Sequence, residues 1–190
     1  MENNNRILNK PLHILLFTNA LILISGAMLG PIYALFVEKV GGDLLDVSII
    51  ATGFALVAGI TTVLVGRLSD EIKESELIIV LGYFLIGVGF LLYLFVESVF
   101  FLFFVGTLIG FAEAIYSPAF DALYTKHMIK KKAGNVWGIW EGMFYFTSAL
   151  GSLIGGVIVT YYGFNLIFII MACLSFSSAL YIYFLSRKIL

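Results

Sequence analysis

Long apolar runs, separated by short polar segments, repeat along the whole chain. They cover residues 12–37, 47–68, 77–96, 99–124, 136–160 and 164–185. A helix rises about 1.5 Å per residue, so each run is long enough to cross a hydrocarbon core about 30 Å thick. The runs lack the strict alternation of barrel strands, and open strand edges cannot be satisfied in lipid. The pattern predicts an all-α integral membrane protein, with one domain of six transmembrane helices over residues 1–190.

Composition excludes a soluble globular domain. Hydrophobic residues make up 61% of the chain and charged residues 12%, and the mean hydropathy is +1.05. A soluble surface needs far more charge than this. The formal net charge of -1 gives no indication of a nucleic-acid partner. The single cysteine, Cys173, has no partner for a disulfide within the chain.

The distribution of basic residues predicts the orientation. Ten of the 11 Lys and Arg residues fall on the side of the two termini, and Lys39 alone falls on the other side. Short cytoplasmic loops carry such an excess of positive charge. Both termini are therefore expected in the cytoplasm, with the protein in the plasma membrane. The basic stretch "KHMIKKKAGN", residues 126–135, is expected to meet anionic lipid headgroups.

Two prolines lie at equivalent places in two predicted helices. Pro31 follows the start of the first helix by 19 residues, and Pro118 follows the start of the fourth by the same number. The first and fourth helices cross the membrane in opposite directions, because three crossings separate their starts. The match predicts helix breaks at both prolines and an inverted 3+3 repeat, an arrangement typical of transporters. Coincidence is the alternative, since proline is common in membrane helices.

Several stretches resemble the major facilitator superfamily. The loop "GRLSD", residues 66–70, is similar to the first part of the Gly-x-Leu-(Ala/Ser)-Asp signature of that family. The stretch "LIGFAEAIYSPAFDAL" resembles its fourth helix, and "AGNVWGIWEGMFYFTSALGSLIGGVIVTYYGFNLIF" resembles its Gly-rich fifth helix leading into the sixth. The resemblance covers the whole chain. It implies one six-helix bundle of a fold in which the substrate lies between two such bundles.

The sequence also departs from the family pattern. The signature usually continues as Asp-Arg-x-Gly-Arg, whereas Asp70 is followed by Glu71-Ile72-Lys73-Glu74. Gly155 is followed by Gly156 where the antiporter motif has Pro, and the fourth helix has no Arg, so the resemblance does not specify a proton antiporter. A single bundle resembles a half-transporter. It is expected to form a parallel homodimer, and a separately encoded partner half is the alternative.

Three acidic residues inside the predicted helices are the candidates for solute or proton coupling. Glu113 is near the middle of the fourth helix, Asp121 is toward its cytoplasmic end, and Glu141 is in the cytoplasmic part of the fifth. Charged groups in a membrane usually face a cavity, although a residue near a helix end can reach the interface. Glu113 is therefore the expected proton- or cation-handling group. The polar residues expected to line the substrate cavity are Asn19, Ser25, Tyr33, Tyr116 and Ser117.

Two features suggest contacts between bundles. The resemblance places Gly66, Arg67 and Asp70 in a gating loop, where the Asp70 carboxylate would meet the N-terminus of the partner's fifth helix. A solvated loop that only orients the chain is the alternative. The fifth helix also has two small-xxx-small patterns, which allow close approach either within a bundle or between bundles. These patterns are formed by Gly138, Gly142, Gly151 and Gly155.

The predicted function is secondary active transport of a small solute by alternating access. Proton-coupled efflux of a cationic or amphipathic compound is the expected form, because the predicted cavity is acidic and aromatic and no span contains an internal Lys or Arg. The alternative is a membrane bundle that transports nothing and instead binds and regulates another membrane protein. No stretch resembles a nucleotide loop, a catalytic triad or a zinc site. The sequence thus predicts no enzyme activity, cofactor, metal or nucleic-acid partner.

Overall fold

In the computed structural model, which describes residues 8–69, 74–186 and 189–190, the protein is a helical bundle whose successive crossings run in opposite directions. The first crossing comprises α1 (Lys10–Leu29), the 3-10 turn η1 (Gly30–Ile32) and α2 (Tyr33–Lys39). The later elements are α3 (Leu44–Ser69), α4 (Ser75–Leu92), η2 (Tyr93–Phe95), α5 (Val99–His127), η3 (Lys130–Lys132), α6 (Ala133–Tyr162) and α7 (Phe164–Tyr183). Six crossings in the described ranges are long and apolar enough to span a membrane. The predicted all-helical membrane class is confirmed.

Local signals in the sequence set the helix ends. The side-chain oxygen of Asn9 accepts a hydrogen bond from the Leu12 backbone N–H at 3.1 Å, which caps α1. Ser98 caps α5 in the same way, through a 3.3 Å bond from the Phe101 N–H. Gly163 has a φ of 79°, a conformation that favours glycine, and it joins α6 to α7 through a single residue.

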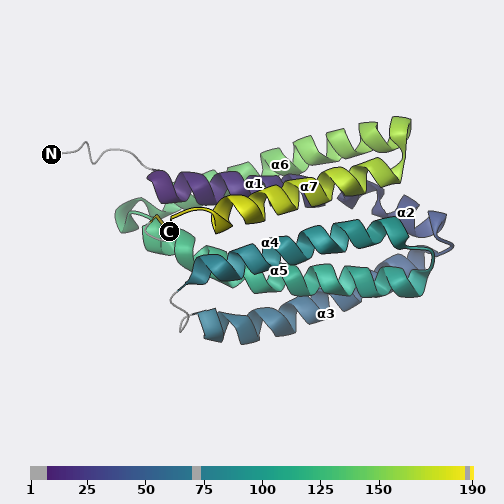
Figure 1. Ribbon diagram of the computed structural model, residues 1–190, viewed down its shortest axis with the longest axis horizontal. Coiled ribbons are helices and arrows are strands. Elements are labelled where there is room, and N and C mark those ends of the chain that lie inside the picture. The colour runs from purple at the N-terminus through teal and green to yellow at the C-terminus, as the bar shows by residue number, and fades with distance from the viewer. Residues whose placement is uncertain (1–7, 70–73, 187–188) are drawn as a thin grey trace.

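The helices pack as two groups of three (Figure 1). In one group α1 packs against α6 and α7, and in the other α5 packs against α3 and α4, while α4 and α7 join the groups. The first, second and third crossings correspond to α5, α6 and α7. Replacing each crossing by its counterpart in the other half of the chain converts one group into the other. Each triplet has an odd number of crossings, so the two triplets run in opposite directions. The packing therefore follows the predicted inverted 3+3 repeat, in which each half of the chain contributes three crossings. The first helix of each half packs with the second and third crossings of the other half.

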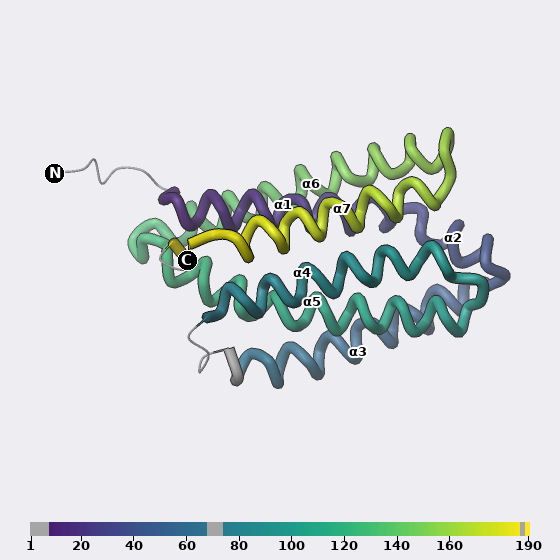
Figure 2. The backbone as a smooth tube through the Cα atoms, viewed as in Figure 1, coloured from purple at the N-terminus to yellow at the C-terminus, as the bar shows by residue number. Residues whose placement is uncertain are grey.

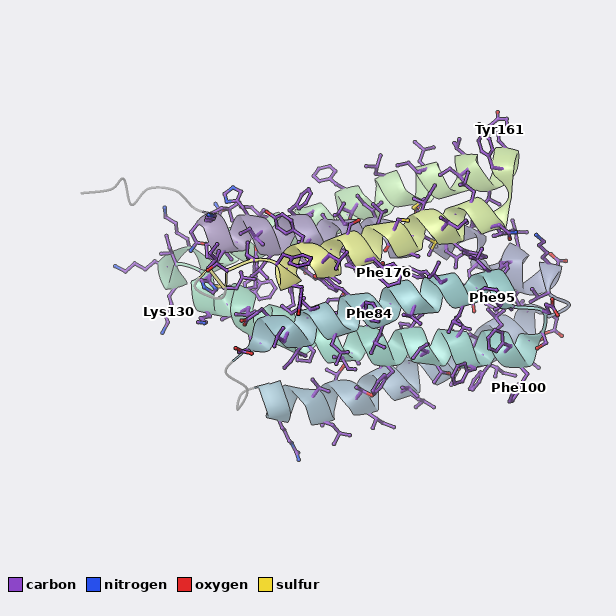
Figure 3. The ribbon with its side chains drawn as sticks, viewed as in Figure 1. Phe84, Phe95, Phe100, Lys130, Tyr161 and Phe176 are labelled. Atoms are coloured by element: carbon purple, nitrogen blue, oxygen red, sulfur yellow. The ribbon has the colours of Figure 1, made fainter. Side chains whose placement is uncertain are left out.

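The two ends of the bundle differ in charge. α1 begins and α7 finishes at the same end (Figure 2). Lys130 lies at this end, which we call the basic end, and Phe95, Phe100 and Tyr161 lie at the opposite end (Figure 3). We call the opposite end the acidic end. Its loops and helix ends hold the carboxylates of Glu38, Asp43, Asp46 and Glu97.

Two helices are covered least by the rest of the chain. Within an apolar stretch of 18 residues in each crossing, 11% of the residues are buried in α3 and 17% in the crossing formed by α6. The share is 33% to 50% in the other crossings. Large apolar side chains are exposed along both helices, among them Ile60 of α3 and Phe146 of α6. These surfaces are suited to contact with lipid or with another apolar bundle.

Only one of the two predicted helix breaks is present. The α-helical pattern changes to a 3-10 turn at Gly30–Ile32, around Pro31. By contrast, α5 continues through Pro118 without interruption, so the break predicted there is absent. Gly30 weakens the helix beside Pro31, whereas Pro118 stands between Ser117 and Ala119 in the interior of a 29-residue helix. Membrane helices tolerate an internal proline where neighbouring helices pack around it.

Candidate functional site

A cavity of about 480 Å³ opens between the helices, and every crossing contributes to its wall. On α5 the lining residues Gly106, Ile109, Glu113 and Tyr116 follow one another at intervals of three or four. This spacing places them on a single face of the helix. The first crossing lines the cavity along α1 and across the 3-10 turn as far as Tyr33. The helix break thus lies in the cavity wall.

Aromatic and aliphatic side chains form most of this wall. Phe54 of α3, Phe90 of α4 and Phe144 of α6 each line it. Hydroxyl groups come from Tyr33, Tyr93, Tyr116 and Ser148, and among the described lining residues Glu113 alone is charged. A cavity of this kind suits a largely apolar ligand, held in place by a few polar contacts.

The Glu113 side chain is exposed in the cavity, midway along α5. No Lys or Arg is found among the lining residues that the structure describes. A carboxyl in apolar surroundings without a basic partner needs either a proton or an external cation to balance its charge. The site can therefore receive a positively charged group from a ligand.

The other two acidic candidates lie away from this cavity. Asp121 and Glu141 are both exposed, and neither lines the cavity. Asp121 is eight residues beyond Glu113, which puts it about 12 Å closer to the basic end. Of the three carboxyls predicted for coupling, the structure places only Glu113 in the cavity. The roles of all three residues remain predictions.

Asn19 is buried between helices and does not line the cavity. Its Nδ2 donates a hydrogen bond to the Tyr83 hydroxyl at 3.2 Å, and its Oδ1 accepts one from Trp140 Nε1 at 3.2 Å. The Tyr83 ring in turn meets the Tyr116 ring edge to face, at 4.8 Å between centroids. Asn19 therefore connects α1 with α4 and α6, behind the wall formed by Tyr116.

Ser25 also joins helices. Its hydroxyl donates to the Ile22 carbonyl at 2.6 Å and lies 3.5 Å from the hydroxyl of Ser175 on α7. Ser117 is half-buried and, like Asn19 and Ser25, is not among the lining residues. Of the five polar residues predicted to line the cavity, Tyr33 and Tyr116 do so. The other three do not line this cavity, which corrects the prediction. Asn19 and Ser25 instead contact polar groups of neighbouring helices, as polar residues in membrane helices can.

The glycines of α6 divide into two pairs. A Cβ on Gly151 would lie 2.7 Å from the carbonyl oxygen of Ile24, and one on Gly155 would collide with the backbone of Met28. This pair lets α6 approach α1 within the bundle. A Cβ on Gly138 or on Gly142 would meet nothing within 4 Å. Gly151 and Gly155 therefore serve packing within the bundle, whereas Gly138 and Gly142 make no close contact within the described part of it.

The predicted gating loop is described only in part. Gly66 and Arg67 lie in the last turn of α3, where the Arg67 side chain is exposed. Asp70 falls outside the described residues. Its contact with a partner helix therefore remains a prediction.

The sequence reasoning missed most of the apolar wall and two hydroxyl groups, those of Tyr93 and Ser148. Phe54, Phe90, Phe144 and Ser148 were not singled out, although all of them line the cavity. One signal was available: counting in steps of three and four from Glu113 along its helix gives Tyr116, Ile109 and Gly106. No comparable polar anchor marks the faces of α3 or α4 that line the cavity.

Comparison with known proteins decides the family. The Major Facilitator Superfamily profile matches residues 15–189. The chain belongs to the major facilitator superfamily. Membership agrees with the prediction of a transporter family rather than an enzyme, and with an integral membrane location.

Relatives of this superfamily member are about twice its length. It is 28% identical over 189 residues to an uncharacterized MFS-type transporter of Methanocaldococcus jannaschii, covering 98% of this chain and 47% of the relative. It is 27% identical over 172 residues to the multidrug resistance protein MdtG of Salmonella typhimurium, covering 88% of this chain and 42% of that protein. The chain thus spans about half the length of the curated relatives it matches.

Proposed function

We propose that this bundle is one half of a secondary transporter that moves an amphipathic cation by alternating access. The observation that carries the proposal is the Glu113 carboxyl, which is the single charged group among the described residues of a lining rich in aromatic rings. Aromatic faces attract cations and also accept apolar groups. The name of the relative MdtG, a multidrug resistance protein, supports a solute of this kind.

Exchange at Glu113 gives a physical route to proton coupling. A protonated Glu113 is neutral, and so is a Glu113 carboxylate paired with a cationic solute. Exchanging one for the other leaves no unbalanced charge in the apolar cavity, which avoids the cost of burying a bare ion. The basic end faces the cytoplasm in this proposal, as the distribution of Lys and Arg predicts.

A second bundle completes the proposed transporter, and the exposed apolar faces of α3 and α6 are its contact surfaces. Relatives contain about twice as much chain as the matched region, which supports a partner of similar size. A second copy of this bundle would supply it through a two-fold axis, and each copy would then contribute one Glu113.

The test is transport of tetraphenylphosphonium, a lipophilic cation, by the chain reconstituted in proteoliposomes with an imposed pH gradient. We expect gradient-dependent movement of the cation by the native chain. Glu113→Gln should abolish the pH dependence, because the amide keeps the shape of the side chain but cannot exchange a proton. Glu97→Gln, at an exposed residue outside the cavity that is not a coupling candidate, is the control and should transport normally. An unchanged pH profile in the Glu113 variant would contradict the proposal.

A further inference from the structure

The Tyr33 hydroxyl is a buried polar group without a partner. Tyr33 is the first residue of α2, directly after the 3-10 turn, and its side chain lines the cavity. Its Oη is buried and has no hydrogen-bond partner in the described part of the chain. The Tyr93 phenol is close enough to interact with it and approaches a hydrogen bond, but the geometry of this contact falls outside the hydrogen-bond range. Buried hydroxyls without partners are rare because the lost hydrogen bonds to water are not replaced.

The Tyr33 hydroxyl lies beside two residues of the cavity wall, Gly106 and Ile50. Tyr33 Oη lies 4.0 Å from the position that a Cβ on Gly106 would take, and Ile50 is the other neighbour there. Both Gly106 and Ile50 line the cavity. Thr107 Oγ1 is also buried without a partner, but Thr107 is not among the lining residues. Of these two hydroxyls, only that of Tyr33 belongs to a residue in the cavity wall.

Glu113 lies on the same face of α5 as Gly106, at a fixed distance along the helix. Gly106 and Glu113 are seven residues apart on α5, which corresponds to about two turns and about 10 Å along the axis. The wall between them contains Ile109, with no polar side chain from α5. Along this face of α5, an apolar stretch therefore separates the Glu113 carboxyl from the place beside Gly106 where the Tyr33 hydroxyl lies.

We propose that the cavity selects elongated amphipathic amines with two polar ends. The ammonium group meets Glu113, and a hydrogen-bond acceptor about 10 Å away takes the proton of the Tyr33 hydroxyl. A turn of the Tyr33 ring, at the helix break beside Gly30, brings its hydroxyl to this acceptor and gives it a hydrogen-bond partner. This inference rests on the proposed function for the cationic end, and it adds Tyr33 as a specificity-determining residue.

The experiment compares two amines of almost equal shape, bound to the full chain in lipid nanodiscs and followed by calorimetry. One is nonylammonium, and the other is its isostere with an ether oxygen in place of the methylene about 10 Å from the nitrogen. We expect the native chain to bind the ether roughly threefold to tenfold more tightly, as for one net hydrogen bond. A second ether, with its oxygen near the nitrogen instead of about 10 Å away, should bind no more tightly than nonylammonium.

Three variants separate the possible results. Tyr33→Phe should remove the preference for the ether and leave nonylammonium binding unchanged, without loss of stability, because the deleted hydroxyl has no partner. Thr107→Val removes the other hydroxyl that is buried without a partner among the described residues, at a residue outside the lining; it is the control and should keep the preference. Glu113→Gln should weaken the binding of both amines.

Three results would overturn the inference. Equal binding of the two amines by the native chain, or a preference that survives Tyr33→Phe, overturns it and leaves the proposed cationic site intact, provided that binding still depends on Glu113. Failure of the native chain to bind either amine overturns both proposals.

Discussion

At the scale of single residues, Asn19 shows how a polar side chain in a membrane helix can serve packing alone. Its amide connects α1 to Tyr83 of α4 and to Trp140 of α6. Asn19→Leu keeps a similar volume but removes both hydrogen bonds. We expect it to lower the free energy of unfolding by about 1–2 kcal/mol, measured by thermal or detergent-induced unfolding. Ser117→Ala, at a half-buried hydroxyl, is the control, and equal stability of the two variants would contradict this role of Asn19.

The site could be predicted only partly from the sequence. Glu113, Tyr33 and Tyr116 were found because charged and polar residues are rare in apolar helices. Asn19 and Ser25 belong to the same class of residue but lie against neighbouring helices. Sequence does not reveal the rotation of each helix about its axis, and this rotation decides whether a polar side chain faces the cavity or another helix. Phe54 and Phe90 were missed for the same reason, since aromatic residues occur on every face of these helices.

At the scale of helices, the glycines of α6 give a test with a control in the same element. Gly155→Ala should push α6 away from α1, because the added Cβ would collide with the Met28 backbone. Overpacking of this kind costs about 1–3 kcal/mol. Gly138→Ala adds a Cβ where nothing lies within 4 Å, so it should leave the bundle as stable or more stable. Thermal unfolding of both variants checks this, and a neutral Gly155→Ala would contradict close packing of α6 on α1.

The number and approximate limits of the helices followed from the apolar runs, because each run is long enough to span lipid and is bounded by polar residues. Breaks inside a helix were harder to predict. Pro31 and Pro118 have equal offsets, yet only Pro31 accompanies a change of helix type. The backbone bonds lost at a proline are compensated differently beside glycine and within a packed helix, and sequence offset carries no information on that packing.

At the scale of the whole molecule, the exposed faces of α3 and α6 allow a test of the proposed homodimer. Ile60 of α3, Phe146 of α6 and Leu180 of α7 each lie 16 residues from the helix end at the acidic end, and all three are exposed. After Cys173→Ser, cysteines at residues 60 and 146 should crosslink between copies in a bilayer. Cysteines at residues 60 and 180 are the depth-matched control and should not. Absence of the first crosslink, or equal formation of the second, would contradict a dimer formed through α3 and α6.

The exchange of first helices between the two groups has a consequence for synthesis. α5 meets its partners α3 and α4 as soon as it enters the membrane, because both precede it in the chain. α1 enters first, yet its main partners α6 and α7 are made last. During translation, α1 must therefore remain in the bilayer with Asn19 and Ser25 lacking their partners on later helices. The nascent chain depends on its first helix staying inserted without its main partners until the last two helices arrive.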